Sequence, residues 1–387
     1  MKVILEAQTA CNKTPRGISY YSIQLIRQLL KRRKYEYELT FFDGDRTRNN
    51  LQYINNYFSE FDVPVHECNS LDYRIMQSDN SIFAQKSYND YTGAYGDVFH
   101  FMHLISIPAN LQGEMVVTIH DLLPVIFPEF FIEGFQSIFE LGIKRLNDAK
   151  PTVIADSSAT KEDVVKFTNI PPENIYVIPL AYDDTKFFPV KNDAILHQLG
   201  LEDSPYLLYL GGIDMRKNIV RIIEAFECIA EKFSDIKLVL AGGMDWNANP
   251  ILSNLNDSKH RSRIVITDYV TDEQKQALYA GATAYLFPSL YEGFGLPVLE
   301  AMACGCPVIT SNVSSLPEVA GEAALLVDPY NTEQLVHEME RIIISESLRE
   351  ELKCKGFEQC KKFSWDKTAE MTEEVYKIAA LTNERGA

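Results

Sequence analysis

Short apolar runs alternate with longer segments of mixed polarity along almost the whole chain. The runs are rich in Val, Ile, Leu, Phe and Tyr and are shorter than ordinary helices, so they are expected to form buried β-strands. They cover residues 3–7, 38–42, 98–102, 116–119, 153–155 and 175–178 in the first half, and residues 206–210, 237–241, 264–266, 284–287, 308–310 and 325–327 in the second. Such alternation is typical of parallel sheets with helices on both faces, and it predicts an α/β fold.

The two halves of the chain are expected to be separate domains. A chain of 387 residues is long for one hydrophobic core, and the stretch 180–189 has the composition of a loop. Beyond it, the strand 206–210 ends in two glycines, and apolar residues recur at helical spacing over 219–233. We therefore expect two Rossmann-like domains, residues 1–185 and residues 186–363.

The composition excludes several classes of protein. Hydrophobic residues make up 46% and charged residues 24%, which is ordinary for a globular protein. The net charge of −17 argues against a nucleic-acid-binding surface. The seven cysteines show no paired Cys-x-x-Cys spacing, which favours reduced thiols. The chain start is charged too soon for a signal peptide and no run of roughly 18 apolar residues occurs, so a cytoplasmic location is expected.

One basic cluster stands out against the acidic background. It consists of Arg27, Lys31, Arg32, Arg33 and Lys34, at the end of an amphipathic run. Cations at a helix C-terminus are commonly solvated and interact with the helix dipole, which is the simpler interpretation. The alternative is contact with lipid headgroups at the inner face of the cell membrane, or with a phosphate-bearing acceptor.

The segment from Glu292 to Glu300 is the most informative about function. It is predicted to be a glycine loop that runs into a helix, because Pro297 suits the first helical position and a later Gly-x-Pro marks the end. Gly293 and Gly295 allow the backbone to come close to a ligand. The unpaired N–H groups and the positive dipole end of such a helix favour phosphate.

Glu300 falls among apolar residues of that predicted helix. A carboxylate there is costly unless hydrogen-bond donors reach it, and the hydroxyls of a ribose would supply them. The alternative is simple stabilisation by the helix dipole, which is worth only about 0.3–1 kcal/mol. Because two glycines and a second carboxylate, Glu292, occur together with Glu300, the ligand interpretation is favoured.

A second candidate phosphate site follows the strand 206–210. Its loop runs from Gly212 to Arg216 and Lys217, which stand just before the predicted helix. A phosphate at this place would meet two cations and a helix N-terminus. Adjacent basic residues can also be solvated or capping groups, but their position after a glycine-ended strand favours phosphate binding.

His120 and Asp121 follow the predicted strand 116–119. They stand at the strand end where open α/β sheets bind ligands. Taken alone, a histidine at such a place is more often structural. Asp121 would either orient a partner or cap the following turn.

The run PSLYEGFGLPVLEAMACGCPVI at residues 288–309 resembles the donor-site signature of the retaining GT-B glycosyltransferases of family 4. The core of that signature is two glutamates separated by seven residues, and the resemblance extends over nearly the whole chain. It implies two Rossmann-like domains that face each other across a donor-binding cleft. Residues 1–185 would form the acceptor domain, and residues 186–363 would form the nucleotide-sugar donor domain. The resemblance also implies that the last helix, residues 364–387, crosses back to the first domain.

The resemblance assigns roles to the candidate residues. Glu292 would hold sugar hydroxyls, and Glu300 would hold the ribose. Lys217 and Arg216 would bind the leaving phosphates, and His120 would bond the donor sugar. Further donor-binding positions carried over from the family are Gly17, Gly212, Tyr269, Val270, Gly293, Phe294, Gly295 and Leu296.

The chain departs from the family pattern at three positions. Gly212 stands where many relatives have a phosphate-binding arginine, so Arg216 would have to compensate. Ser19 replaces a second glycine after Gly17, which affects close backbone approach at that point. Asp268 stands where glycine is usual in the segment that contacts the base, and a plain strand-to-helix turn explains that segment equally well.

The resemblance implies a metal-independent transfer of a hexose from a nucleoside-diphosphate sugar, with retention of the anomeric configuration. In front-face attack the leaving diphosphate accepts the acceptor proton, so neither an enzyme base nor a cofactor is expected. GDP-mannose is the leading donor, with UDP- or dTDP-sugars as alternatives. The acceptor would be a saccharide or a lipid-linked glycan in surface polysaccharide synthesis.

Three alternative functions fit less of the sequence. A nicotinamide dehydrogenase would need a Gly-x-Gly-x-x-Gly loop with an acidic residue about twenty positions on, and neither glycine loop has this pattern. A retaining glycosidase-type pair of carboxylates leaves the phosphate-binding loops unexplained. A non-catalytic subunit that binds glycans or partners is disfavoured by the joint presence of Lys217, Glu292 and Glu300.

Overall fold

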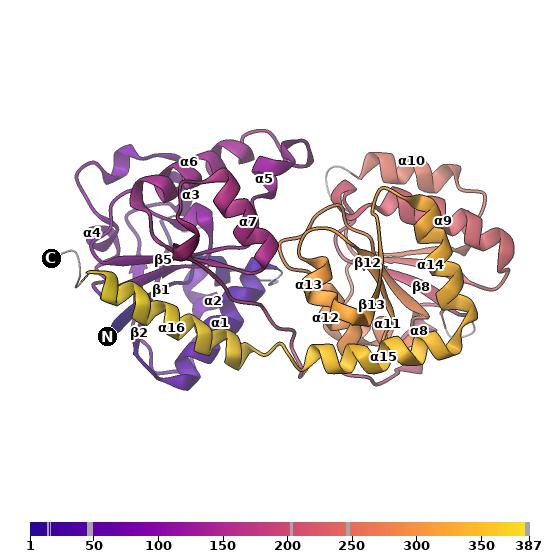
Figure 1. The fold of residues 1–387 in the computed structure, drawn as a ribbon. Helices are drawn as coiled ribbons and strands as arrows, with labels where there is room; N and C mark the ends of the chain where they lie inside the picture. Colours follow the sequence, from indigo (N-terminus) through magenta and orange to yellow (C-terminus); the bar gives the residue numbers. More distant parts are fainter. Residues whose placement is uncertain (14, 16, 45–48, 202–203, 245–247, 384–387) are drawn as a thin grey trace. The chain divides into compact units, whose positions relative to one another are not determined.

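The computed structural model describes residues 1–13, 15, 17–44, 49–201, 204–244 and 248–383. The chain forms two compact units, drawn in Figure 1. Unit 1 comprises Met1–Leu180 and Trp365–Ala387, and unit 2 comprises Ala181–Ser364. Of the predicted crossover helix, residues 384–387 lie outside the described part of the chain.

The boundary lies five residues before the expected 185/186 junction. The carbonyl of Asp183 accepts a hydrogen bond from the N–H of Phe187 at 2.9 Å. The ring of Phe187 packs edge-on against Tyr279, with ring centroids 6.2 Å apart. This turn is therefore closed on itself and packed on unit 2, although its sequence has only the composition of a linker.

The sheet of unit 1 has seven parallel strands in the order β3-β2-β1-β4-β5-β6-β7. They are β1 (Lys2–Glu6), β2 (Glu36–Phe42), β3 (Val65–Cys68), β4 (Val98–Phe101), β5 (Glu114–Ile119), β6 (Thr152–Ala155) and β7 (Ile175–Val177). The helices of this unit are α1 (Ile18–Arg32), α2 (Asn50–Phe58), α3 (Tyr73–Ser78), α4 (Tyr88–Thr92), α5 (Leu123–Ile126), α6 (Phe135–Ala149), α7 (Ser158–Phe167) and α16 (Trp365–Asn383).

The sheet of unit 2 has six parallel strands in the order β10-β9-β8-β11-β12-β13. They are β8 (Tyr206–Leu210), β9 (Lys237–Ala241), β10 (Ile264–Thr267), β11 (Ala284–Phe287), β12 (Val308–Ser311) and β13 (Ala324–Val327). The helices are α8 (Asp193–Gln198), α9 (Ile219–Lys232), α10 (Asn249–Asp257), α11 (Asp272–Gly281), α12 (Leu296–Ala303), α13 (Leu316–Ala320), α14 (Thr332–Ile344) and α15 (Glu346–Cys360).

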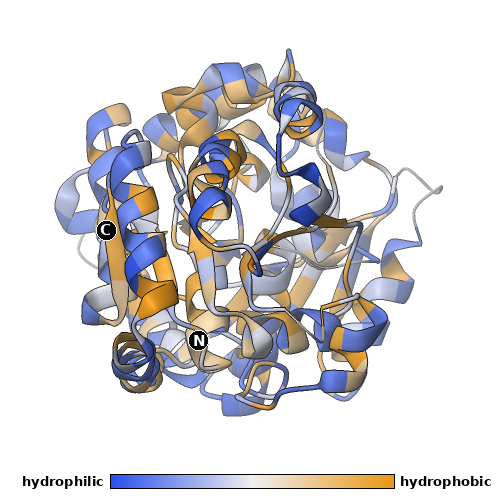
Figure 2. Cartoon of the chain, turned by 90° about the vertical axis from the view of Figure 1, so that its right-hand side faces the viewer, coloured by the Kyte–Doolittle hydropathy of each residue, from blue (hydrophilic) through white to orange (hydrophobic). Residues whose placement is uncertain are grey.

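The predicted α/β fold with two Rossmann-like sheets is confirmed. In both sheets the central strands are apolar and buried, because helices cover both of their faces. The helices in Figure 2 carry hydrophilic and hydrophobic positions side by side, as expected for one face in the core and one in water. All twelve predicted strands are present, and β3 is an additional strand that the pattern did not indicate.

The helix α16 is fixed in unit 1 by a cluster of charges. Its buried Glu373 accepts a hydrogen bond from Arg32 Nε at 3.0 Å, and Arg32 also binds the exposed Asp366 at 2.6 Å. Lys34 Nζ binds Glu374 at 2.6 Å. These two cations of the predicted basic cluster therefore hold α16 on α1.

The remaining members of the basic cluster differ among themselves. Arg27 donates to the backbone carbonyl of Tyr57 at 3.2 Å and forms an ion pair with Glu60. Lys31 and Arg33 are exposed. In the described part of the chain, no helix combines the length and the hydropathy needed to cross a bilayer.

Candidate active site

The helix α12 forms where the sequence predicts it, directly after a glycine loop. Gly295 precedes the helix with φ 116°. A Cβ at that position would also lie 2.8 Å from the side chain of Leu316, so only glycine fits. Pro297 occupies the second helical position rather than the first, where its missing N–H is again without cost.

A second loop connects β8 to α9 and carries the predicted cations. Asp214 caps a short 3₁₀ turn at Met215–Lys217 by accepting from the N–H of Lys217 at 3.2 Å. Asn218 then adopts a left-handed conformation with φ 62°, and α9 begins at the next residue. Arg216 and Lys217 therefore stand directly before a fourteen-residue helix, as predicted.

Gly211 of this loop and Gly242, at the end of the neighbouring strand β9, allow the two strand ends to approach closely. A Cβ on Gly242, which follows β9, would lie 1.9 Å from the carbonyl oxygen of Gly211. The N–H of Ile213 donates to the carbonyl of Gly243 at 2.9 Å, and the Tyr209 hydroxyl donates to the carbonyl of Gly212 at 2.6 Å. The loop that bears the cations is thus fixed to the neighbouring strand end.

The two loops meet at Glu292. Lys217 Nζ lies 2.5 Å from Glu292 Oε1, and Arg216 Nη1 lies 3.6 Å from Glu292 Oε2. Burial by itself raises the pKa of Glu292, but the two cations outweigh it and hold that pKa below its usual value. Burial, together with the neighbouring Arg216, lowers the pKa of Lys217 against the attraction of Glu292. Two adjacent cations therefore form one cluster with a carboxylate that lies 75 positions after Lys217 in the chain.

Glu300 is the fifth residue of α12. Its neighbours differ from those of Glu292. The hydroxyl of Tyr279 donates to its Oε2 at 3.4 Å. Burial and the nearby Asp272 raise the pKa of Glu300 to about 7, and the neighbouring Lys275 and Lys186 oppose this rise. Such a carboxyl group can still accept hydrogen bonds from a ligand, and its charge changes near neutral pH.

Tyr269 and Val270, the predicted base-contacting residues, lie in the turn between β10 and α11. Tyr269 is 50% exposed, whereas the side chain of Val270 is buried. The turn ends in a capping box in which Thr271 and Gln274 bond to each other's backbone N–H groups. A strand-to-helix turn is therefore present, and a face of Tyr269 is accessible beside it.

His120 lies at the carboxyl end of β5 in unit 1, and its two ring nitrogens are both engaged. Nδ1 lies 2.6 Å from Asp156 Oδ2, and Nε2 lies 3.0 Å from the carbonyl oxygen of Met102. Burial opposes the charged ring, but Asp156 and the Met102 carbonyl raise the pKa of His120 overall. Asp121 caps the next turn by accepting from the N–H of Leu123 at 3.0 Å.

Asp156 is a residue that the sequence analysis missed. It follows β6, which pairs with β5 in parallel, so the carboxyl ends of the two strands are adjacent. Both strands were predicted and both are followed by polar residues, but the sequence pattern does not show that the two strands are neighbours in the sheet. Asp156, rather than Asp121, is the carboxylate that orients His120.

Gly17 immediately precedes α1 and has φ 48° and ψ −115°, a conformation that favours glycine. Apart from Gly17 itself and its two chain neighbours, no atom of the described residues lies within 4 Å of the place where its Cβ would be. The neighbouring Arg16, part of the same predicted loop, lies outside the described residues.

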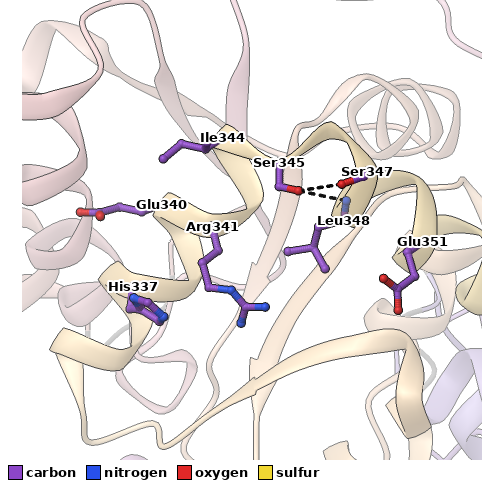
Figure 3. A pocket seen from close by; sticks show the side chains of 8 residues that line it. All are labelled: His337, Glu340, Arg341, Ile344, Ser345, Ser347, Leu348 and Glu351. Carbon is purple, nitrogen blue, oxygen red and sulfur yellow. Dashed lines mark hydrogen bonds between the residues drawn. The ribbon is translucent and has the colours of Figure 1, made fainter.

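Unit 2 also has a surface hollow of about 490 Å³ that involves none of the predicted site residues. Figure 3 shows its lining, which comes from the end of α14 and the start of α15: His337, Glu340, Arg341, Ile344, Ser345, Ser347, Leu348 and Glu351. The Ser345 hydroxyl bonds to the Leu348 N–H at 3.2 Å and to the Ser347 hydroxyl at 3.1 Å, which is ordinary helix capping. Glu340, Arg341 and Glu351 of the hollow form ion pairs with Lys232, Glu338 and Lys355.

Comparison with known proteins identifies relatives of the second unit and of the whole chain. The family model of the group 1 glycosyl transferases matches residues 192–359, which include Arg216, Lys217, Glu292 and Glu300. O-antigen chain mannosyltransferase B of Escherichia coli is 28% identical over 377 residues, which are 94% of this chain and 96% of that protein. The serotype-specific mannosyltransferase WbdA of Escherichia coli is 31% identical over 280 residues, which are 70% of this chain but 34% of that protein.

Solved structures share the fold over nearly the full length. Sucrose-phosphate synthase from Thermosynechococcus elongatus gives a TM-score of 0.76 at 22% identity and covers 97% of this chain and 98% of its own. The Anabaena protein HepE, in complex with UDP and glucose, gives a TM-score of 0.74 at 16% identity. The match covers 97% of this chain and 99% of the HepE chain. WaaG, a glycosyltransferase involved in lipopolysaccharide biosynthesis, gives a TM-score of 0.64 at 14% identity. The match covers 97% of this chain and 99% of the WaaG chain.

Proposed function

We propose that this chain, a glycosyltransferase of group 1 with the GT-B fold, transfers mannose from GDP-mannose to a saccharide or lipid-linked glycan acceptor. The proposed transfer retains the anomeric configuration and serves surface polysaccharide synthesis. The names of the Escherichia coli relatives support mannose and an O-antigen type of product. UDP- and dTDP-sugars are the alternative donors.

The observation that carries the proposal is the cluster in which the partly buried Lys217 and Arg216 meet the buried Glu292. Transfer breaks the bond between the anomeric carbon and the diphosphate oxygen, and negative charge develops on that oxygen. Two preorganised cations in a site of low polarity stabilise this charge most strongly where it develops. Arg216 lies in the same cluster, so it can provide the second cation where Gly212 stands in place of an arginine.

The reaction needs few other groups. The acceptor hydroxyl attacks the anomeric carbon on the face from which the diphosphate leaves, and its proton passes to the departing phosphate oxygen. The products are the glycosylated acceptor and the nucleoside diphosphate, so atoms and charge balance without an enzyme base. We propose that Lys217, Arg216 and the N-terminus of α12 supply the stabilisation without a metal ion.

The remaining donor contacts are assigned by chemistry. Glu292 accepts hydrogen bonds from sugar hydroxyls, and the backbone of Gly293, Phe294, Gly295 and Leu296 provides the helix start that binds phosphate and sugar oxygens. Glu300 accepts from the ribose hydroxyls, and the exposed face of Tyr269 with the backbone of Val270 contacts the base.

We also propose that Gly17 and His120 of unit 1 contact the donor. The conformation of Gly17 before α1 suits a backbone N–H that faces phosphate. For His120, the role requires Nε2 to exchange the carbonyl of Met102 for a sugar hydroxyl. Contact with a membrane surface, also proposed, would depend on the exposed Lys31 and Arg33, because the other cations of the cluster are paired within unit 1.

A panel of nucleotides tests the proposal directly. Thermal unfolding is followed with GDP, UDP, dTDP and their hexose conjugates, because a ligand that binds only the folded state raises the unfolding temperature. The anomeric proton of the new glycosidic linkage in the product is then observed by NMR. Stabilisation by GDP-mannose and an α-linked product support the proposal. A protein that responds to none of these nucleotides, or that gives an inverted product, contradicts it.

A further inference from the structure

Four hydroxyl side chains of β12 and the following turn bind the backbone that leads into α12. Thr310 Oγ1 donates to the carbonyl of Phe287 at 2.9 Å, and Ser311 Oγ donates to the carbonyl of Ser289 at 2.6 Å. Further along, Ser314 Oγ accepts from the N–H of Glu292 at 3.1 Å. Ser315 Oγ lies 3.0 Å from the carbonyl oxygen of Glu292 and 2.6 Å from that of Phe294.

Ser314 and Ser315 hold the glycine loop, whereas the first two hydroxyls hold the strand end before it. Ser315 is 0% exposed, and its single hydroxyl proton is shared between two carbonyls that flank Gly293. Ser314 has φ 53°, an uncommon conformation for a residue other than glycine. Backbone strain of this kind persists only where surrounding contacts enforce it, and it is common at functional sites.

The contacts of Ser315 fix the direction of two peptide groups. The peptide bonds of this loop are trans, so each carbonyl points opposite to the N–H of the next residue. Because Ser315 binds the carbonyls of Glu292 and Phe294, the N–H groups of Gly293 and Gly295 point away from Ser315. Gly295 is also the residue that precedes α12, so its N–H adds to the donors of that helix start.

We propose that Ser315 is a positioning residue for donor binding, which rests on the function proposed above. Its hydroxyl turns the Phe294–Gly295 peptide, and with it the Glu292–Gly293 peptide, so that N–H groups rather than carbonyl oxygens face the phosphate and sugar oxygens of the donor. A peptide turned the other way would present a carbonyl dipole to an anion. Ser315 therefore acts on the donor through the loop and does not touch it.

The experiment compares Ser315→Ala with Ser311→Ala. Both serines are fully buried, and each donates to a backbone carbonyl at 2.6 Å, so the two substitutions remove similar contacts. Of these two serines, Ser315 binds the glycine loop, whereas Ser311 binds the strand end before it. Affinity for GDP-mannose, GDP and UDP is measured by titration calorimetry. Unfolding temperature and the hydrogen exchange of a peptide covering residues 290–297 are measured without ligand.

We expect the unfolding temperature to fall by a similar amount in both variants. Ser315→Ala should also lose about tenfold in affinity for the nucleotide that binds the wild-type protein, which is the size of one hydrogen-bond contribution. Exchange in residues 290–297 should rise in Ser315→Ala and stay at the wild-type level in Ser311→Ala. Ser315→Thr, which keeps the hydroxyl, should restore both properties.

The outcomes separate this inference from the proposed function. If the wild-type protein binds no nucleotide, the proposed function fails, and hydrogen exchange alone still decides whether Ser315 fixes the loop. Wild-type affinity and unchanged exchange in Ser315→Ala overturn the positioning role. Equal losses of affinity in Ser315→Ala and Ser311→Ala also overturn it, because they would indicate a general loss of stability.

Discussion

Lys217 Nζ lies 2.5 Å from Glu292 Oε1, although the two residues are 75 positions apart in the chain. The ammonium group also lies 5.0 Å from the ring centroid of Phe287, so an aromatic face covers part of it. The cation of the proposed phosphate site is thus paired with the proposed sugar-binding carboxylate. We expect a donor in this site to give both groups new partners, phosphate for Lys217 and sugar hydroxyls for Glu292.

Replacing Lys217 by alanine should reduce transfer roughly 100- to 1000-fold, the usual effect of removing one preorganised donor at a developing charge. It should also destabilise the fold by about 3 kcal/mol, because Glu292 would remain buried with a weaker partner. Initial rates with GDP-mannose and urea unfolding measure the two effects. Lys232→Ala, which removes an exposed cation of α9, is the control and should change neither.

A double substitution distinguishes loss of stability from loss of chemistry. Lys217→Met with Glu292→Gln removes the buried charge pair as a whole, and replacing such a pair is often neutral for folding. We expect the double variant to recover most of the stability lost by Lys217→Ala and to remain inactive. Recovery of transfer along with stability would remove both residues from the catalytic site.

Glu300 should make donor affinity depend on pH. Burial raises the pKa of Glu300 to about 7, so the group is protonated in acid and ionised above neutrality. Ribose hydroxyls donate better to the ionised form, so affinity for GDP-mannose should rise between pH 6 and pH 8, with release of a proton near pH 7. Titration calorimetry in buffers of different ionisation enthalpy measures both.

Glu300→Gln is the variant that tests this assignment. It should bind GDP-mannose roughly 10- to 100-fold more weakly at pH 8, since hydrogen bonds to charged groups contribute about 1.5–3 kcal/mol. Its affinity should not change between pH 6 and pH 8. GDP-mannose is the better ligand for this experiment, because the terminal phosphate of GDP itself titrates between pH 6 and pH 8. An unchanged pH profile in the variant would show that another group is responsible.

The sequence predicts those parts of the site that are local in the chain. The glycine loop before α12, the cations before α9 and the strand ends all follow from short-range patterns, because turns, caps and helix starts depend on neighbouring residues. The edge strand β3 was missed because its sequence Val-His-Glu-Cys does not alternate and its Val65 is exposed. Edge strands need not be apolar on both faces.

The partners of the site residues were the least predictable part. Asp156 meets His120 only because β5 and β6 are neighbours, and Ser315 meets Glu292 only because β12 lies beside β11. Serine and aspartate are common in turns for local reasons, so their types alone do not indicate these long-range contacts. The order of strands in the sheet, which the sequence pattern does not provide, decides them.

Glu6 should make the stability of unit 1 fall as pH rises. It is 1% exposed, and among the described residues its Oε2 has no hydrogen-bond partner. Burial raises the pKa of Glu6 to about 7. A carboxyl group whose pKa is raised by folding stabilises the protein below its unfolded pKa, and this contribution is lost as pH rises through 7. Glu6→Gln should therefore be more stable than wild type at pH 8, by up to about 3 kcal/mol.

Glu38 on the neighbouring strand provides a comparison of opposite sign. Burial raises its pKa, but Lys2 and His66 outweigh this and lower it. The stabilising contribution of Glu38 is thus present at neutral pH and is lost in acid. Urea unfolding at pH 5 and pH 8 should show Glu38→Gln losing stability at pH 8, where Glu6→Gln gains it. The same sign for both substitutions at pH 8 would contradict the assignment for Glu6.

Glu373 should be the residue that keeps α16 in place. It is fully buried and binds Arg32 at 3.0 Å and the Tyr37 hydroxyl at 3.2 Å, whereas its neighbour Glu374 binds Lys34 at the surface. Removing one partner of a buried charge pair usually costs about 3–5 kcal/mol, and removing a surface pair costs little. Glu373→Gln should therefore lower the stability of unit 1, and hydrogen exchange should rise along residues 365–381. Glu374→Gln, one position away, should behave as wild type, and equal effects of the two would show that this helix is held by its apolar face alone.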